Sequence, residues 1–133
     1  MLLDQSFLDE LTAQAQSNPR LRQAYDLRTT SEDQSQRILN ALEPGTQVPV
    51  HRHATSAETL VVVRGRLLQK LYNEKGELIE TYEMVSGGAS SVMQIPTGQF
   101  HSLECLESGT VIFEAKDGAY APLAKEDVIS SMD

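Results

Sequence analysis

The chain has 133 residues, of which 11 are basic and 19 acidic, so its net charge is −8. This length suits one domain with a single hydrophobic core, and the charge repels nucleic acid phosphates and anionic lipid surfaces. No apolar run approaches the roughly 20 residues of a membrane span, and the N-terminus is acidic where a signal peptide would be basic. We therefore expect a cytoplasmic protein that has neither nucleic acid nor a membrane as a partner.

Residues 1–35 are expected to form an N-terminal helix and a polar arm. Apolar residues recur there at helical spacing, namely Phe7, Leu8, Leu11 and Ala15. Asp4 is suited to cap this helix, and the pair Asn18-Pro19 is suited to end it. Between residues 20 and 36 the chain is polar and shows neither period, which favours a loop with at most one short strand. We expect both parts to pack on the remainder of one structural domain.

Residues 36–133 are expected to form a β-barrel. Short runs rich in Val, Ile, Leu and Tyr are separated by turn signals that contain Gly, Pro, Asn and Ser. The regular spacing of these breaks and the total of about eight strands are typical of a jelly roll. The tail from Gly118 onward has too little apolar periodicity for an assignment. The expected strands lie near residues 36–42, 46–53, 58–64, 66–73, 77–84, 89–95, 100–106 and 109–116.

The chain has one cysteine, Cys105, which cannot form an internal disulfide. A single thiol agrees with a reducing compartment. A small buried hydrophobic residue is the favoured interpretation of Cys105, and a catalytic thiol is the alternative.

All three histidines of the chain lie in one spacing pattern. His51 and His53 are two positions apart, so on a strand both side chains point to the same face. Glu58 follows after a turn, and His101 follows the turn at residues 96–98. Imidazole nitrogens and a carboxylate oxygen together suit one divalent transition metal: Fe, Mn, Zn, Ni or Co. We predict a metal site formed by His51, His53, Glu58 and His101, with Glu58 either a ligand or a base; histidines without a metal role are the alternative.

This spacing resembles the first motif of the cupin superfamily. Gly45, His51, His53, Glu58 and Gly65 meet its fixed positions. The second motif is met by Pro96, Gly98 and His101, whereas Ser90 and Cys105 stand where it has Gly and Asn. Longer stretches, residues 19–23, 36–46 and 109–116, are similar to the WbuC-type cupin metalloproteins of bacteria. The resemblance implies an all-β fold, the cupin double-stranded β-helix or jelly-roll barrel, with an N-terminal α-helix and a metal inside the barrel.

Residues in the family-like stretches that flank the site are candidates for contact with a substrate. Glu114 and Lys116 share one strand face, although an exposed ion pair would leave the same pattern. If Lys116 and Arg37 both face the pocket, they form a cationic rim that suits a phosphate, carboxylate or sugar phosphate. Gln69 and Gln94 are further wall candidates, since strand parity does not say which side they line. The candidates are Arg37, Asn40, Lys116 and Tyr120 for substrate binding, and Glu58 and Glu114 for catalysis.

The family resemblance favours an enzyme of bacterial polysaccharide metabolism. It implies a metal-dependent isomerase or epimerase that acts on a carbohydrate or sugar-phosphate-like small molecule, with Glu58 or Glu114 moving a proton. The alternatives are an Fe(II)-dependent dioxygenase, because the ligand set leaves coordination positions open, and a non-catalytic metal-dependent binding protein. Edge strands of a small jelly roll need cover, so we also expect a homodimer.

Overall fold

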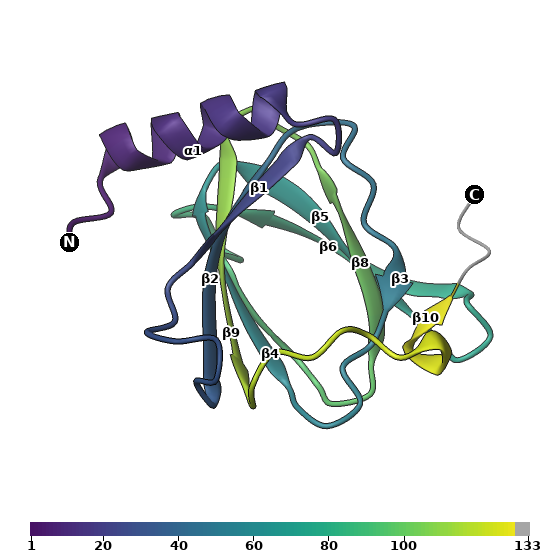
Figure 1. Ribbon diagram of the computed structural model, residues 1–133. Coiled ribbons are helices and arrows are strands. Elements are labelled where there is room, and N and C mark those ends of the chain that lie inside the picture. Colours follow the sequence, from purple (N-terminus) through teal and green to yellow (C-terminus); the bar gives the residue numbers. More distant parts are fainter. Residues whose placement is uncertain (130–133) are drawn as a thin grey trace.

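The computed structural model describes residues 1–129, which form one α-helix and two antiparallel β-sheets of five strands each. The two sheets face each other (Figure 1). The last residues of the expected barrel range, 130–133, lie outside the described residues. The elements are α1 (Gln5–Ser17), β1 (Arg22–Asp26), β2 (Ser35–Leu42), β3 (Val50–His51), β4 (Glu58–Arg64), β5 (Arg66–Tyr72), β6 (Leu78–Val85), β7 (Val92–Ile95), β8 (Phe100–Cys105), β9 (Thr110–Asp117), a short 3₁₀ helix η1 (Lys125–Asp127) and β10 (Val128–Ile129).

The order of strands explains how distant parts of the sequence meet. One sheet has the order β1-β2-β9-β4-β7 and the other β10-β3-β8-β5-β6. Strands that are not consecutive in the sequence are neighbours in both sheets, as is typical of a jelly roll, so the predicted all-β barrel with an N-terminal helix is confirmed. Among residues 1–129, no helix combines the length and apolarity needed to cross a bilayer.

Helix α1 covers the outer face of the first sheet. The Asp4 carboxylate accepts a hydrogen bond from the Phe7 amide at 3.0 Å, as expected of a cap. The buried helix residues Leu8, Leu11 and Ala15 pack against Leu39, Ala41 and Val111 of strands β2 and β9. The outward face of these two strands is therefore apolar, and their inward face is left for the barrel interior (Figure 1).

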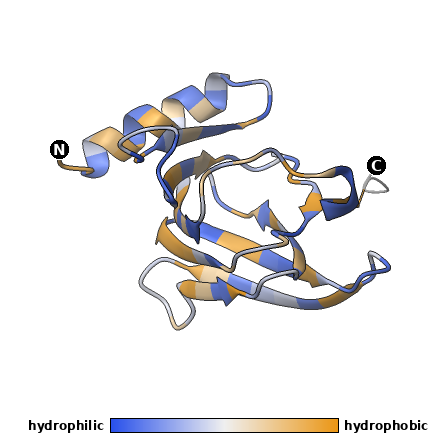
Figure 2. Ribbon diagram, turned by 60° about the horizontal axis from the view of Figure 1, so that its bottom comes forward, coloured by the Kyte–Doolittle hydropathy of each residue, from blue (hydrophilic) through white to orange (hydrophobic). Residues whose placement is uncertain are grey.

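Apolar and polar residues alternate along the strands (Figure 2), as expected when successive side chains of a strand point to opposite faces of the sheet. The predicted strand 46–53 is an exception, because only Val50 and His51 pair with neighbours. Pro49 has no N–H to donate to a ladder, and the Thr46 amide is used in a turn with the Glu43 carbonyl. Strands β1 and β10 extend the sheets beyond the eight predicted strands.

One end of the barrel interior is filled by an apolar cluster. It includes Leu42, Leu60, Leu67 and Met84, each nearly inaccessible to solvent. Cys105 belongs to this cluster, and its thiol donates to the Glu107 carbonyl at 3.1 Å. Burial raises the pKa of the Cys105 thiol, so the predicted buried role is confirmed. The opposite end of the interior is polar.

Candidate metal centre

The three histidines meet at the polar end of the barrel. His51 on β3 lies directly opposite His101 on β8 in the strand register, and their ring centroids are 4.3 Å apart. His53 follows two residues after His51, with ring centroids 5.1 Å from His51 and 5.5 Å from His101. One ring nitrogen of each lies within 4.8 Å of the others. The three side chains could therefore hold a single metal ion.

Backbone carbonyls orient two of these rings. His51 Nδ1 lies 2.8 Å from the Pro49 carbonyl oxygen, and His101 Nδ1 lies 2.8 Å from the Gln99 carbonyl oxygen. Because a carbonyl can only accept, each Nδ1 carries the hydrogen and each Nε2 offers a lone pair. Burial, assisted by the charge of His101, lowers the pKa of His51 to about 4, and burial also lowers the pKa of His101. Both rings are thus neutral at pH 7, as metal ligation requires.

Glu58 begins strand β4 beside the histidines and is 4% exposed. Its carboxylate oxygens lie 3.2 Å from His53 Nε2 and 3.8 Å from His101 Nε2. Lys116, its partner in the register of β4 and β9, brings Nζ to 3.8 Å. Burial alone would raise the pKa of Glu58, but the hydrogen bond with His53 and the neighbouring charges outweigh burial and lower it. An ionised Glu58 is placed where it could act as a fourth ligand or as a base.

Glu114 is a second carboxyl group in the same space. It points inward from β9, where Leu60 of β4 is its register partner, and it accepts a hydrogen bond from the Asn40 amide at 3.4 Å. Burial raises the pKa of Glu114 to about 8, and the charge of Glu58 adds to this rise. At neutral pH the site therefore holds one protonated and one ionised carboxyl group side by side, which is an arrangement suited to moving a proton.

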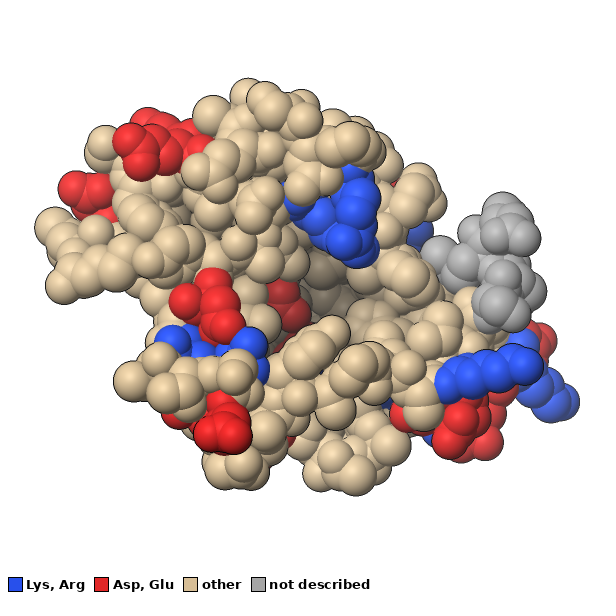
Figure 3. Space-filling view, viewed as in Figure 1, with Lys and Arg blue, Asp and Glu red and all other residues tan. Residues whose placement is uncertain are grey.

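These residues line a cavity of about 420 Å³. Figure 3 shows a hollow near the centre of this face, with acidic and basic side chains at its edge. Among residues 1–129, three buried side-chain polar atoms have no hydrogen-bond partner: Asn40 Oδ1, Gln69 Oε1 and His101 Nε2. All three residues line this one cavity. Buried polar atoms are normally paired, so their concentration here indicates a place for a polar ligand and an ion.

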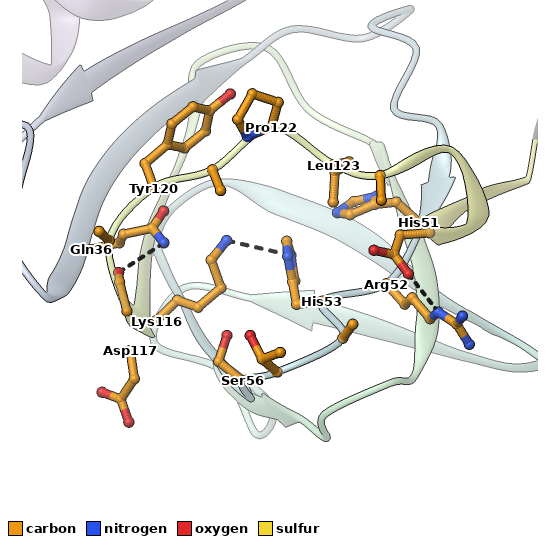
Figure 4. A pocket seen from close by; sticks show the side chains of 17 residues that line it. Gln36, His51, Arg52, His53, Ser56, Lys116, Asp117, Tyr120, Pro122 and Leu123 are labelled. Atoms are coloured by element: carbon orange, nitrogen blue, oxygen red, sulfur yellow. Dashed lines mark hydrogen bonds and ion pairs between the residues drawn. The ribbon is translucent and has the colours of Figure 1, made fainter.

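The C-terminal segment 118–124 crosses the mouth of the barrel between β9 and β10 (Figure 1). The same segment lines a second hollow of about 390 Å³, and Tyr120 and Leu123 line both hollows. Figure 4 shows Lys116 pointing toward His53 below this segment, with Nζ 3.5 Å from Nε2. Arg52 holds η1, which follows this segment, because the Arg52 Nε donates a hydrogen bond to Asp127 Oδ1 at 2.9 Å. The segment thus forms one wall of the cavity, which the sequence did not predict.

Of the residues predicted to contact a substrate, Asn40, Glu114, Lys116 and Tyr120 line the cavity. Arg37 does not, in contrast to the sequence-based expectation. It alternates with Gln36 and shares the outward face of β2 with Leu39 and Ala41. Its guanidinium donates to the carbonyls of Ser35 and Leu27 and lies 3.5 Å from an Asp33 carboxylate oxygen. Of the two further wall candidates, Gln69 lines the cavity, whereas Gln94 bonds Thr59 outside it.

Two arginines that sequence reasoning missed, Arg20 and Arg22, line the cavity in place of Arg37. Strand parity could not have found them, because Arg20 lies before β1, which begins at Arg22, and Leu21 between them is left-handed. The polar arm around them shows no periodicity, so the sequence did not single them out.

A family model described as a domain of unknown function, DUF6016, matches residues 3–84. No curated protein matches the chain. Solved structures do: KdgF from Halomonas sp. has a TM-score of 0.60 and 15% sequence identity, with 77% of this chain and 84% of that chain covered. The capsular polysaccharide assembling protein CapF from Staphylococcus aureus has a TM-score of 0.64 and 24% identity over 84% of this chain and 30% of that chain.

Oxalate decarboxylase from Bacillus subtilis, whose Mn(II) centres have been studied, has a TM-score of 0.59 and 19% identity. The match covers 84% of this chain and 28% of that chain. The chain therefore spans about a third of the CapF and oxalate decarboxylase chains. At these identities the likeness shows the fold alone, and it agrees with the predicted jelly-roll barrel.

Proposed function

This chain belongs to the DUF6016 family, a domain of unknown function, and we propose that it is a metal-dependent isomerase or epimerase of a carbohydrate or sugar-phosphate-like small molecule. One observation carries the proposal. Three histidines converge with the carboxyl groups of Glu58 and Glu114 on a single polar cavity that has unpaired buried atoms. Isomerisation beside a carbonyl needs these parts, namely an electrophile and groups that remove and return a proton.

The residues take distinct roles in this proposal. His51, His53 and His101 hold the ion, with Glu58 as fourth ligand or as base. A bound divalent metal supplies Lewis acidity that polarises a substrate oxygen. Glu114, which Asn40 holds by a hydrogen bond, gives and takes the proton. Lys116 offsets negative charge beside Glu58, and the apolar cluster beneath the site excludes water from the interior.

The comparisons support the choice of substrate class and metal. CapF is described as a capsular polysaccharide assembling protein, and this chain matches 30% of its length. That description and the WbuC-like stretches favour a bacterial polysaccharide pathway. A cytoplasmic location is part of the proposal and rests on the composition of the sequence. The Mn(II) centres of oxalate decarboxylase place Mn first among Fe, Mn, Zn, Ni and Co for testing.

The test is exchange of solvent deuterium into aldose and ketose phosphates by the Mn(II)-loaded full chain, followed by proton NMR. We expect exchange at the carbon next to the carbonyl. Glu114→Gln should abolish exchange and keep the metal, whereas Glu58→Gln should also lose the metal if Glu58 is a ligand. Absence of exchange with every sugar phosphate would reject the isomerase. Fe(II)-dependent oxygen uptake would then identify a dioxygenase, and recovery of an unchanged bound ligand would identify a binding protein.

We also propose a homodimer that pairs through the edge strand β6. This strand ends the second sheet and exposes Leu78 and Ile79, which are 53% and 52% exposed. An apolar edge strand is a ready template for a second copy. Sedimentation equilibrium should give a dimer for the wild type and a monomer for Ile79→Lys. A monomeric wild type at tens of micromolar would reject this proposal.

A further inference from the structure

Arg20 and Arg22 differ from every other arginine of residues 1–129. Each of the other five has a carboxylate oxygen within 4.0 Å of its guanidinium: Arg28, Arg37, Arg52, Arg64 and Arg66. Neither Arg20 nor Arg22 forms an ion pair within this part of the chain, although the protein has 19 acidic residues. Both line the cavity that contains the histidines. Two cations that have no ion-pair partner among the described residues and lie on one cavity wall indicate an anionic ligand.

A strained backbone conformation lies between these two arginines. Leu21, which lies between them, has φ of 56°, in the left-handed region that residues other than glycine rarely adopt. Hydrogen bonds fix it on both sides, from the Leu21 amide to the Asn18 carbonyl at 2.8 Å and from the Glu43 amide to the Leu21 carbonyl at 3.0 Å. Such a conformation persists only where its surroundings enforce it, so the placement of both arginines is a built feature.

Arg22 is the more deeply placed of the two. Its Nη1 donates to the Gln47 carbonyl at 2.6 Å, which holds the guanidinium at the cavity wall. Burial lowers the pKa of Arg22, the charge of Arg20 lowers it further, and the charge of Glu114 opposes both without outweighing them. A partly desolvated cation beside a like charge is unfavourable in the free protein. A bound anion would offset the like charge and stabilise the ionised guanidinium.

Other walls of the cavity offer hydrogen-bond acceptors instead of charge. Gln69 is 0% exposed, and its Nε2 donates to the Ser102 carbonyl at 2.9 Å. Because a carbonyl can only accept, the amide orientation is fixed and Oε1 is the atom left unpaired. Asn40 Oδ1 is unpaired in the same cavity. Two buried acceptors without donors suit the hydroxyl groups of a ligand.

We propose that Arg20 and Arg22 form an anion subsite for the phosphate or carboxylate of the substrate, and that Gln69 and Asn40 accept hydrogen bonds from its hydroxyl groups. The substrate class is then a polyhydroxylated compound with one anionic group, a sugar phosphate or a sugar acid. This inference rests on the proposed function, since it takes the histidine cluster as the reacting end of the cavity. The volume of about 420 Å³ lies in the usual range of small-molecule sites.

The test compares three probes that share a hexose ring: glucose 6-phosphate, glucuronate and glucose. Their affinities for the Mn(II)-loaded full chain are measured by calorimetry. The wild type should bind at least one anionic probe about tenfold or more tighter than glucose. Arg20→Gln/Arg22→Gln should weaken that probe by about a hundredfold and leave glucose unchanged. The tighter of the two anionic probes identifies phosphate or carboxylate as the natural group.

The matched control is Arg66→Gln/Lys75→Gln, which removes two positive charges on the exposed surface away from the cavity and should bind as the wild type. The single variant Arg20→Gln controls for a folding defect of the double variant, because the Arg20 side chain makes no hydrogen bond among the described residues. It should keep the melting temperature and lose about tenfold in affinity.

Equal affinities of the wild type for anionic probes and glucose, or equal binding by the double variant, would overturn the subsite. Failure of the proposed function looks different. Deuterium exchange would be absent while arginine-dependent binding of the anionic probe remained.

Discussion

Replacing His101 by glutamine is expected to weaken Mn(II) binding by roughly a hundredfold or more. His101 supplies one of three imidazoles that could reach a single ion, and its Nε2 is buried without a partner among residues 1–129. Glutamine keeps a polar side chain but removes the imidazole, whose Nδ1 is held by the Gln99 carbonyl and whose Nε2 is left for the metal. Isothermal titration calorimetry of the full chain with Mn(II), Fe(II) and Zn(II) measures the loss for each metal.

The same variant should lose the stabilisation that metal gives to the folded state. An ion present at 100 times its Kd adds about 2.7 kcal/mol to the free energy of unfolding. The wild type should therefore melt at a higher temperature with Mn(II) and return to its lower value with EDTA. Glu104→Gln is the control, since Glu104 lies on the same strand and pairs with Lys70 at 3.1 Å away from the site. An equal metal-induced shift in His101→Gln would place the metal outside the histidine cluster.

The histidine cluster could be predicted because its geometry is mostly local. Two residues separated by one position on a strand share a face, which brings His51 and His53 together without information from the rest of the chain. His101 needed the family spacing as well, because the pairing of β3 with β8 is a long-range contact. The neighbourhood of Glu58 and Glu114 depends on the register of β4 with β9, which the sequence pattern did not specify.

The cationic wall could not be predicted in the same way. Strand parity correctly places Arg37 and Gln36 on opposite faces of β2. It does not say which of these faces points into the barrel. Helix α1 decides this, because it covers the face of β2 that carries Leu39 and Ala41. Arg20 and Arg22 depend on the left-handed conformation of Leu21, which no residue preference predicts. Of the two predicted cations, Lys116 therefore lines the cavity and Arg37 does not.

Replacing Gly65 by alanine is expected to lower the free energy of unfolding by about 3 to 5 kcal/mol. Gly65 joins β4 to β5 with φ of +88°, where an L side chain is strained. A Cβ at this position would lie 2.3 Å from Thr110 Oγ1 and 2.7 Å from Thr110 Cα. Thr110 cannot move aside easily, because it is 0% exposed and its hydroxyl bonds the Arg66 amide and the Glu107 carbonyl. Urea unfolding followed by circular dichroism measures the change.

Gly87→Ala separates backbone strain from steric collision. Gly87 has a similar φ of +70°, but no atom lies within 4 Å of a Cβ built there. Its replacement should cost only the conformational term, about 1 kcal/mol. A Gly65→Ala variant as stable as Gly87→Ala would show that the sheet relaxes around Thr110. A larger loss at Gly65 would give the last glycine of the metal-site motif a structural role, since its close approach to Thr110 holds the end of the strand that begins with Glu58.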